Sequence, residues 1–355
     1  MLRNRLEAVL SDPPALFLPV LILLSLFYRG LSSFYRFLFS SGTLRSSRLS
    51  RPVVSVGNLA VGGGGKTPLT MWLAQRLIAS DIKVAVLTRG YGRTSDGLRI
   101  VEPEDSWQRV GDEPVLMVSR IKGMTVAVSK DRFAAGKKVL ENSDVDLFLL
   151  DDGYQHYALW RDLDIVVVDG LRRFGNGRLL PAGILREPVS RLRYADVVVV
   201  TKAHQKDYKF ESYLKRHTKA PIFWADYLPM ELEPVEPSVL MPGRREPGGT
   251  FLAFCGIAGP DGFRETLARA GVEVADLLIF PDHHPYSASD VDLILEAASR
   301  SNADALVTTE KDAVRWPHGT LPLPVFALPV HPVIENEEEL LEEILGLVRK
   351  ARGTA

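Results

Sequence analysis

Four consecutive glycines followed by a lysine and a threonine have the clearest chemical potential in this chain: Gly62, Gly63, Gly64, Gly65, Lys66 and Thr67. Glycines let backbone N–H groups turn toward phosphate oxygens, and a helix that begins at such a loop adds its partial positive charge. Lys66 would bridge the β- and γ-phosphates of a nucleotide, and Thr67 would ligate its Mg²⁺. The usual pattern has a glycine where this chain has Ala60. A plain flexible turn is therefore the alternative.

Two adjacent acids, Asp151 and Asp152, end the apolar run at 147–150. Proteins with a phosphate loop place their Mg²⁺-binding carboxylate at the end of a neighbouring strand. Either acid could take that role, and an ordinary turn or helix cap is the alternative. A guanine-reading motif would need an acid where His204 stands after the apolar run at 196–201. Its absence favours ATP over GTP.

Two further groups of polar residues could contact a substrate. Tyr91 lies between Arg89 and Arg93 just after the apolar run at 83–88, where ligand sites of α/β proteins form. Asn176 lies among Arg172, Arg173 and Arg178, a basic loop that could hold a phosphate. For the basic loop, the alternative is a solvated loop without a ligand.

These residues need a scaffold that gathers strand ends. PVVSVG at 52–57 precedes the glycine loop, and apolar residues at helical spacing follow it. Short apolar runs at 83–88, 125–129, 145–150, 163–169 and 196–201 are typical of a parallel sheet covered on both faces. We therefore predict a doubly wound α/β domain at 46–227, a linker rich in proline, glycine and charge at 228–249, and a second, smaller α/β domain at 250–355.

The composition excludes several classes of protein. A formal net charge of −1 over 355 residues gives no global attraction to nucleic acid, so we expect no nucleic-acid partner. The single cysteine, Cys255, excludes an internal disulfide framework and suits a reducing cytoplasm. No obligate protein partner is evident.

The N-terminal segment at 1–45 is apolar and flanked by arginines. Residues 15–28 are almost purely apolar, but fourteen residues reach only about 21 Å as a helix, short of a bilayer core of roughly 30 Å. We expect an anchor that dips into one leaflet or lies at the membrane surface. A buried core helix and a tilted span that includes Arg29 are the alternatives. The arginines that follow would keep the rest of the chain on the cytoplasmic side.

The chain resembles the tetraacyldisaccharide 4′-kinase family of lipid A biosynthesis. The matching segments are SVGNLAVGGGGKTP (55–68), RGYGR (89–93), GDEP (111–114), DDGYQH (151–156), GRLLPAGILREP (177–188), FPDHHPY (280–286) and TTEKDA (308–313). They occur in the family's order, and family members also lack the first glycine of the loop. The apolar N-terminus is similar as well, and it implies the cytoplasmic face of the inner membrane.

The resemblance implies an ATP- and Mg²⁺-dependent kinase that phosphorylates the 4′-hydroxyl of a lipid-linked tetraacyldisaccharide 1-phosphate. It implies two α/β domains with the active site in the cleft. Lys66 and Thr67 would bind nucleotide phosphates and metal, and Asp151 and Asp152 would serve the metal. The base would be Asp112, supported by His283. On the substrate or phosphate side would lie His156, Arg186 and Glu187.

A sugar hydroxyl needs such a base, because it is a poor nucleophile until a carboxylate accepts its proton. The residues alone leave Asp112 open as a helix cap, and they do not decide between His283 and His284. A second class of function shares the nucleotide residues, namely a membrane-associated ATPase that acts as a switch on a protein partner. A nucleotide-binding module without turnover is a third. The GDEP and DHH motifs and the apolar N-terminus favour the kinase.

Overall fold

The computed structural model describes residues 17–235, 249–317 and 321–353, which fall into two compact units. Of the described residues, the larger unit contains 17–227 and 332–353, and the smaller one contains those between 228 and 331. The chain passes between them through two strands, β8 (Ile222–Pro229) and β14 (Val330–Ile334).

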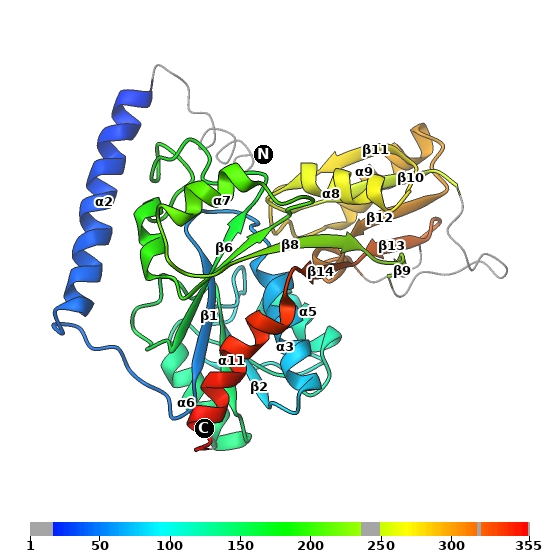
Figure 1. Cartoon of the computed structure of the whole chain (residues 1–355). Coiled ribbons are helices and arrows are strands. Elements are labelled where there is room, and N and C mark those ends of the chain that lie inside the picture. The colour runs from blue at the N-terminus through cyan, green and yellow to red at the C-terminus, as the bar shows by residue number, and fades with distance from the viewer. Residues whose placement is uncertain (1–16, 236–248, 318–320, 354–355) are drawn as a thin grey trace. The chain divides into compact units, whose positions relative to one another are not determined.

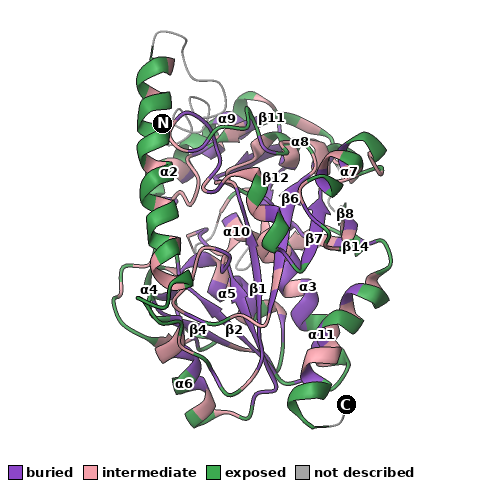
Figure 2. Cartoon of the chain, turned by 60° about the vertical axis from the view of Figure 1, so that its left-hand side comes forward, coloured by how far each residue is buried: buried purple, intermediate pink, exposed green. Residues whose placement is uncertain are grey.

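The larger unit is built on a nine-stranded sheet with the order β14-β8-β7-β6-β1-β5-β2-β4-β3 (Figure 1). Its remaining strands are β1 Val53–Asn58, β2 Val84–Thr88, β3 Arg99–Ile100, β4 Thr125–Val128, β5 Leu147–Asp151, β6 Leu163–Asp169 and β7 Val197–Thr201. Strands β1, β2 and β4 to β8 pair in parallel, whereas β3 runs antiparallel to β4. The central strands are buried on both faces (Figure 2), because their continuous apolar runs leave no polar face for water.

Helices pack on both faces of this sheet. They are α3 Lys66–Ala79, α4 Trp107–Val110, α5 Asp112–Arg120, α6 Arg132–Asn142, α7 Tyr208–Lys215, α11 Glu337–Ala351 and the 3₁₀ helix Val189–Tyr194. One core joins α3, α5 and α11 to one face of the strands. Two further clusters cover the other face, one of them under α6.

The smaller unit has a five-stranded sheet in the order β11-β10-β12-β13-β9. Its strands are β9 Glu233–Pro234, β10 Phe251–Cys255, β11 Val274–Ile279, β12 Ala305–Thr309 and β13 Val325–Leu328, and its helices are α8 Pro260–Arg269, α9 Ala288–Arg300 and α10 Glu310–Ala313. All strand pairs are parallel except β13 with β9. The predicted fold class, a doubly wound, mostly parallel sheet plus a smaller α/β unit, is confirmed.

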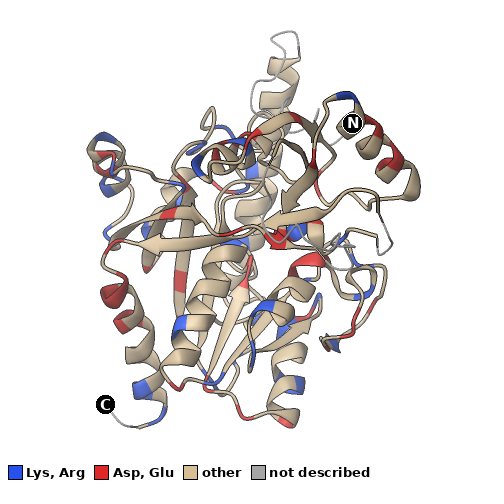
Figure 3. Ribbon diagram, turned by 90° about the vertical axis from the view of Figure 1, so that its right-hand side faces the viewer, with Lys and Arg blue, Asp and Glu red and all other residues tan. Residues whose placement is uncertain are grey.

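The domain limits differ from the expected 250–355 at the end of the chain. Residues 332–355 belong to the larger unit, because α11 buries Leu340, Ile344 and Val348 in the core shared with α3. Arg76 of α3 also pairs with Glu337 at 3.0 Å. The acids in the first turn of α11 and the bases in its last turn lie at opposite ends (Figure 3), as a helix dipole favours. Most of the expected linker, 236–248, lies outside the described residues.

The N-terminal helix α2 runs without a break from Leu18 to Ser40. The helix continues beyond the apolar run at 15–28, through Arg29 and Gly30, to 23 residues or about 34 Å, so its length admits both the expected surface anchor and the tilted span. It is long and apolar enough to cross a membrane. Its outward face is exposed (Figure 2) and carries Leu23, Phe27 and Phe34, each more than half exposed. That exposure excludes a buried core helix.

Candidate active site

The glycine loop joins β1 to α3 at the carboxyl end of the central strand. Helix α3 begins at Lys66, directly after Gly65, so its first amides point toward the loop. Gly65 has a φ of 79°, and a Cβ there would lie 2.4 Å from the Tyr227 hydroxyl oxygen. Only glycine fits this position, since it tolerates both the left-handed backbone and the close approach.

Three side chains, from the end of β7, the residue after it and β8, hold the loop's carbonyl groups. Thr201 donates to the Gly64 carbonyl at 2.8 Å, and Tyr227 donates to that of Gly65 at 2.6 Å. Lys202 donates to the Gly63 carbonyl at 2.8 Å and also pairs with Asp169. These three carbonyl oxygens are thus engaged by side chains that neighbour the loop. Thr201 and Lys202, which resemble the start of a base-reading motif in the sequence, brace the loop instead.

The two acids at the end of β5 have different environments. Asp151 is buried and accepts a hydrogen bond from Thr70 at 3.2 Å. Asp152 is 38% exposed, adopts a φ of 49°, and lies 3.4 Å from Lys66 and 2.9 Å from Arg186. The structure therefore brings Lys66, Arg186 and both acids together, as the sequence predicted.

The charges in this group shift their pKa values in opposite directions. Burial, with the nearby charges of Glu113 and Asp152, raises the pKa of Asp151 to about 7. Burial alone would raise the pKa of Asp152, but Lys66 and Arg186 outweigh it and lower that pKa to about 2. Asp151 is therefore a desolvated carboxyl that gains from a nearby cation.

Arg132, the first residue of α6, is a cation of this site that the sequence interpretation missed. Burial and the charge of Arg89 lower its pKa to about 10, while Asp152 and Asp151 oppose that shift. It follows β4, so its backbone stands at the same sheet edge as the acids. The available signal was the group of charged residues at 130–132 shortly after the apolar run at 125–129.

The GDEP turn also faces the acids, because the charge of Glu113 raises the pKa of Asp151. Asp112 is buried and is the first residue of α5; the N-cap position is Gly111, without a side-chain cap. The Asp112 carboxylate accepts from the Glu113 amide at 2.9 Å, so a role at the start of this helix stays an alternative to the role of base. The turn packs tightly on the loop of Tyr91, since a Cβ on Gly90 would lie 2.5 Å from the Val110 carbonyl oxygen. Tyr91 itself is half exposed.

The other expected substrate residues, His156, Asn176 and Glu187, differ in how far neighbouring residues engage their polar atoms. His156 is partly buried; burial and the charges of Arg132 and Arg161 lower its pKa to about 4, so it is neutral at pH 7. Asn176 braces its own loop, because its amide donates to Ala182 and accepts from the Arg178 amide. Glu187 is buried, and both of its oxygens have partners, which are Tyr157, Arg191 and Arg36.

His283 and His284 lie in the smaller unit and differ in their contacts. His284 stacks on Phe280 and pairs with Asp290 of α9 at 3.1 Å, which is a structural role. His283 has a φ of 58°, and its Nε2 lies 3.1 Å from Lys311 Nζ. Asp312 of the TTEKDA segment is fully buried and accepts from the Gly256 amide, Tyr286 and Arg315. That acid holds the turn after β10 in place.

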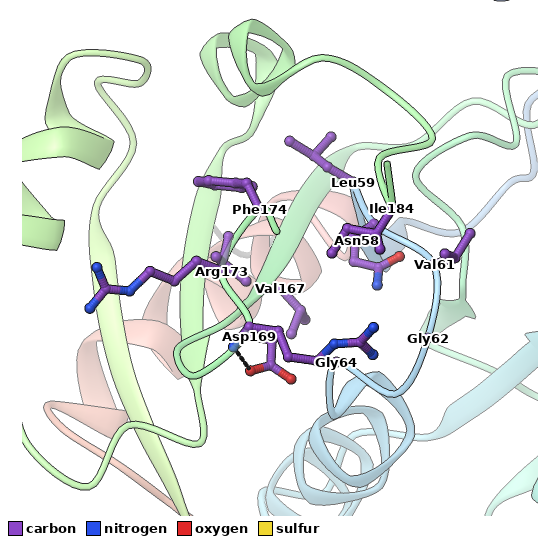
Figure 4. A pocket seen from close by; sticks show the side chains of 13 residues that line it. Asn58, Leu59, Val61, Gly62, Gly64, Val167, Asp169, Arg173, Phe174 and Ile184 are labelled. Carbon is purple, nitrogen blue, oxygen red and sulfur yellow. Dashed lines mark hydrogen bonds between the residues drawn. The ribbon is translucent and has the colours of Figure 1, made fainter. Parts of the chain in front are cut away.

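A pocket adjoins the glycine loop on the β6 side (Figure 4). Its walls come from the β1 end and the loop after β6, namely Asn58, Leu59, Ala60, Val61, Gly62, Gly64, Val167, Val168, Asp169, Arg172, Arg173, Phe174 and Ile184. Asp169 is fixed by the amides of Leu171 and Arg172, both at 2.9 Å. The pocket lies on the opposite side of β1 from β5 and its acids.

No cluster of three or more His, Cys, Asp or Glu side chains that could hold a metal occurs in the described part of the chain. The donors beside the glycine loop nevertheless fit Mg²⁺, which binds through one or two carboxylates and completes its shell with phosphate oxygens and water. A cation would also relieve the raised pKa of Asp151. Asp151, Asp152 and Thr67 are the residues that could hold it.

Comparisons with known proteins agree across the chain. Residues 17–349 match the family model described as tetraacyldisaccharide-1-P 4′-kinase. A tetraacyldisaccharide 4′-kinase of Geobacter sulfurreducens is 42% identical over 91% of this chain and 88% of its own length, and one of Pelobacter propionicus is 39% identical over 86% and 85%. The crystal structure of LpxK from Aquifex aeolicus in complex with ATP superposes with a TM-score of 0.73 at 32% identity, covering 98% of this chain and all of that one.

Proposed function

This chain belongs to the tetraacyldisaccharide-1-P 4′-kinase family, and from that premise we propose how its residues perform the reaction. The protein is an ATP-dependent kinase that transfers the γ-phosphate to the 4′-hydroxyl of a tetraacyldisaccharide 1-phosphate in lipid A biosynthesis. The observation that carries the residue assignments is the gathering of Lys66, Asp151, Asp152 and Arg186 beside the glycine loop. A switch ATPase, the alternative function, finds no support in the comparisons.

The nucleotide lies across β1. We propose that its nucleoside enters the pocket on the β6 side, so that the phosphates run over the glycine loop toward β5. The loop amides and Lys66 hold the β- and γ-phosphates. Braced carbonyls support this orientation, because Thr201 and Tyr227 engage those of Gly64 and Gly65.

A bound Mg²⁺ would supply positive charge against the phosphates during transfer. Thr67, Asp151 and Asp152 would hold it. Lys66 and Arg186 pair with Asp152 in the structure, and both cations could turn to phosphate oxygens once ATP arrives. Arg132, with its lowered pKa, adds a further positive charge at the same edge.

Asp112 accepts the proton of the 4′-hydroxyl as the bond to phosphorus forms. Its burial and the proximity of the neighbouring Glu113 to Asp151 support this role. Of the two histidines in the smaller unit, we assign the catalytic role to His283, because His284 stacks on Phe280 and pairs with Asp290.

The substrate is recognised by groups around the phosphate loop. We assign Arg186 and the neutral imidazole of His156 to the phosphate and sugar, and the half-exposed Tyr91 to the acceptor side. Glu187 and Asn176 support the site indirectly, because their polar atoms are committed to neighbouring residues.

Helix α2 holds the enzyme at a membrane surface, on the cytoplasmic face of the inner membrane. Its inward stripe contacts the larger unit from Ser25 to Arg36, about 16 Å of helix, so the helix lies along the protein. Its exposed apolar face would then rest among lipid headgroups and acyl chains. Replacing Phe27 and Phe34 by glutamate should move the protein from the membrane to the soluble fraction.

Incubation with γ-labelled ATP and a tetraacylated disaccharide 1-phosphate tests the function. We expect label on the lipid, dependent on Mg²⁺ and lost in Lys66→Ala. Release of labelled phosphate without labelled lipid would favour the switch ATPase.

A further inference from the structure

Helix α2 touches the larger unit along a narrow stripe. Ser25 is the only buried residue among those described in this helix, whose outward face is apolar and exposed. Its hydroxyl donates to the Leu179 carbonyl at 2.8 Å and accepts from the Ala182 amide at 3.0 Å. A single serine thus satisfies one backbone donor and one backbone acceptor of a distant loop. An apolar residue would serve membrane insertion better, so this polar contact calls for another reason.

The contacted loop is closed on itself and rigidly braced. Its ends meet where the Leu180 amide donates to Leu185 and the Leu185 amide donates to Arg178. Inside the loop, the Asn176 amide donates to the Ala182 carbonyl at 2.9 Å. Because these hydrogen bonds restrain the loop, we expect a shift of the Ala182 backbone to move the backbone of Leu185 as well.

The far side of the same loop pairs with the strand that leads into the glycine loop. The Val61 amide donates to Ile184 at 2.8 Å, the Arg186 amide donates to Leu59 at 2.7 Å, and Ala60 forms a bridge with Leu185. The next side chain in this pairing is that of Arg186, which contacts both oxygens of Asp152. Hydrogen bonds and short stretches of backbone thus connect Ser25 to the Asp152 carboxylate.

A second contact ties α2 to the residue after Arg186. Arg36 lies 3.5 Å from the Glu187 carboxylate, and Tyr157, which packs against Tyr35 and Phe39 of α2, donates to the same group. Ser25 and Arg36 are eleven residues apart, three helical turns, so they lie on one face. One face of α2 thus contacts both ends of segment 179–187, through Ser25 at one end and Arg36 at the other.

We propose that Ser25 and Arg36 are positioning residues, through which α2 sets the place of Arg186 beside the phosphate loop. The helix then both meets lipid and, through segment 179–187, supports a side chain beside the phosphate loop. When Ser25 and Arg36 make these contacts, Arg186 is held in the position that catalysis needs. The proposal rests on the proposed function of Arg186, since its kinetic consequence passes through that side chain.

The test compares Ser25→Ala with Ser40→Ala in the full chain, in the same detergent micelles. Both remove one hydroxyl from α2, but Ser40 is exposed and donates only within the helix. Ser25→Ala should leave the Ala182 amide without its acceptor, and the Leu179 carbonyl should keep only the Gly183 amide as a donor. We expect kcat at saturating ATP and lipid to fall about ten-fold, equal to about 1.4 kcal/mol, with membrane binding and the KM for lipid unchanged. Ser40→Ala should match the wild type.

Amide hydrogen exchange gives an independent measurement of the same coupling. Exchange within 178–187 and 59–61 should rise in Ser25→Ala and stay unchanged in Ser40→Ala. Unchanged exchange in those segments, or raised exchange with a wild-type kcat, would overturn the proposal. A wild-type chain that transfers no phosphate would instead refute the proposed function, and the exchange result would still decide whether α2 holds the loop.

Discussion

Replacing Asp151 by asparagine should abolish catalysis and yet stabilise the metal-free protein at alkaline pH. Asp151 is buried at the end of β5, where burial and the charges of Glu113 and Asp152 raise its pKa from 3.8 to about 7. A carboxyl with a raised pKa favours the folded state while it is protonated, and that stability is lost as pH rises from about 4 to 7. Asparagine removes the charge and keeps an oxygen for Thr70.

The size of the effect follows from the shift. About three pKa units at about 1.4 kcal/mol each set an upper limit of about 4 kcal/mol above pH 7. Because Glu113 and Asp152 relax once the charge is gone, we expect roughly half, about 2 kcal/mol. For a domain of this size that corresponds to a rise in Tm of about 4–8 °C.

Thermal unfolding in EDTA at pH 8 and pH 5 measures this directly. The variant should be more stable than the wild type at pH 8, and the difference should shrink at pH 5, where Asp151 is protonated. An equal gain in stability at both pH values, or a loss at pH 8, would show that ionisation of Asp151 does not destabilise the folded wild type. Asp144→Asn is the matched control, because that carboxylate is exposed and should show no such pH-dependent gain.

Three other substitutions separate chemistry from structure. Asp112→Asn should lower kcat by at least 10²-fold while ATP still binds, and near-normal turnover at saturating substrate would remove Asp112 from the role of base. Gly65→Ala should raise the KM for ATP more than ten-fold, because its Cβ collides with Tyr227, and a double variant with Tyr227→Ala should recover part of the loss. Asp312→Ala should destabilise the smaller unit by about 3–5 kcal/mol, since it leaves Arg315 buried without its charge partner, and an unchanged unfolding midpoint would contradict this.

The parts of the fold that follow from local pattern were predictable. Continuous apolar runs predicted the parallel strands, and the glycines with Lys66 predicted the phosphate loop. Asp151 and Asp152 stand at the end of β5, next to the strand that leads into the glycine loop, because the ends of parallel strands meet at one edge of a sheet. The position of α11 was not predictable, since its amphipathic pattern says only that it has an apolar face, and the face of α3 is far away in the sequence.

Roles that depend on distant partners also escaped the sequence. Ser25, Lys202 and Tyr227 have ordinary surroundings in the chain, and their functions appear only when Ala182, Gly63 and Gly65 stand beside them. Asn176 was expected at the substrate because polar residues in a basic loop look available. Its side-chain amide instead forms hydrogen bonds with the backbone of Ala182 and Arg178 in its own loop.

The position of the new phosphate on the product tests most directly whether the 4′-hydroxyl is the acceptor and Asp112 the base. Proton–phosphorus correlation by NMR on the lipid formed from ATP and a tetraacyldisaccharide 1-phosphate identifies the carbon that carries the new ester. We expect the new phosphorus to couple to the proton at C4′ with the wild-type chain, and this coupling to be absent with Asp112→Asn. A phosphate at another hydroxyl, or ATP consumed with no phosphorylated lipid, would contradict it.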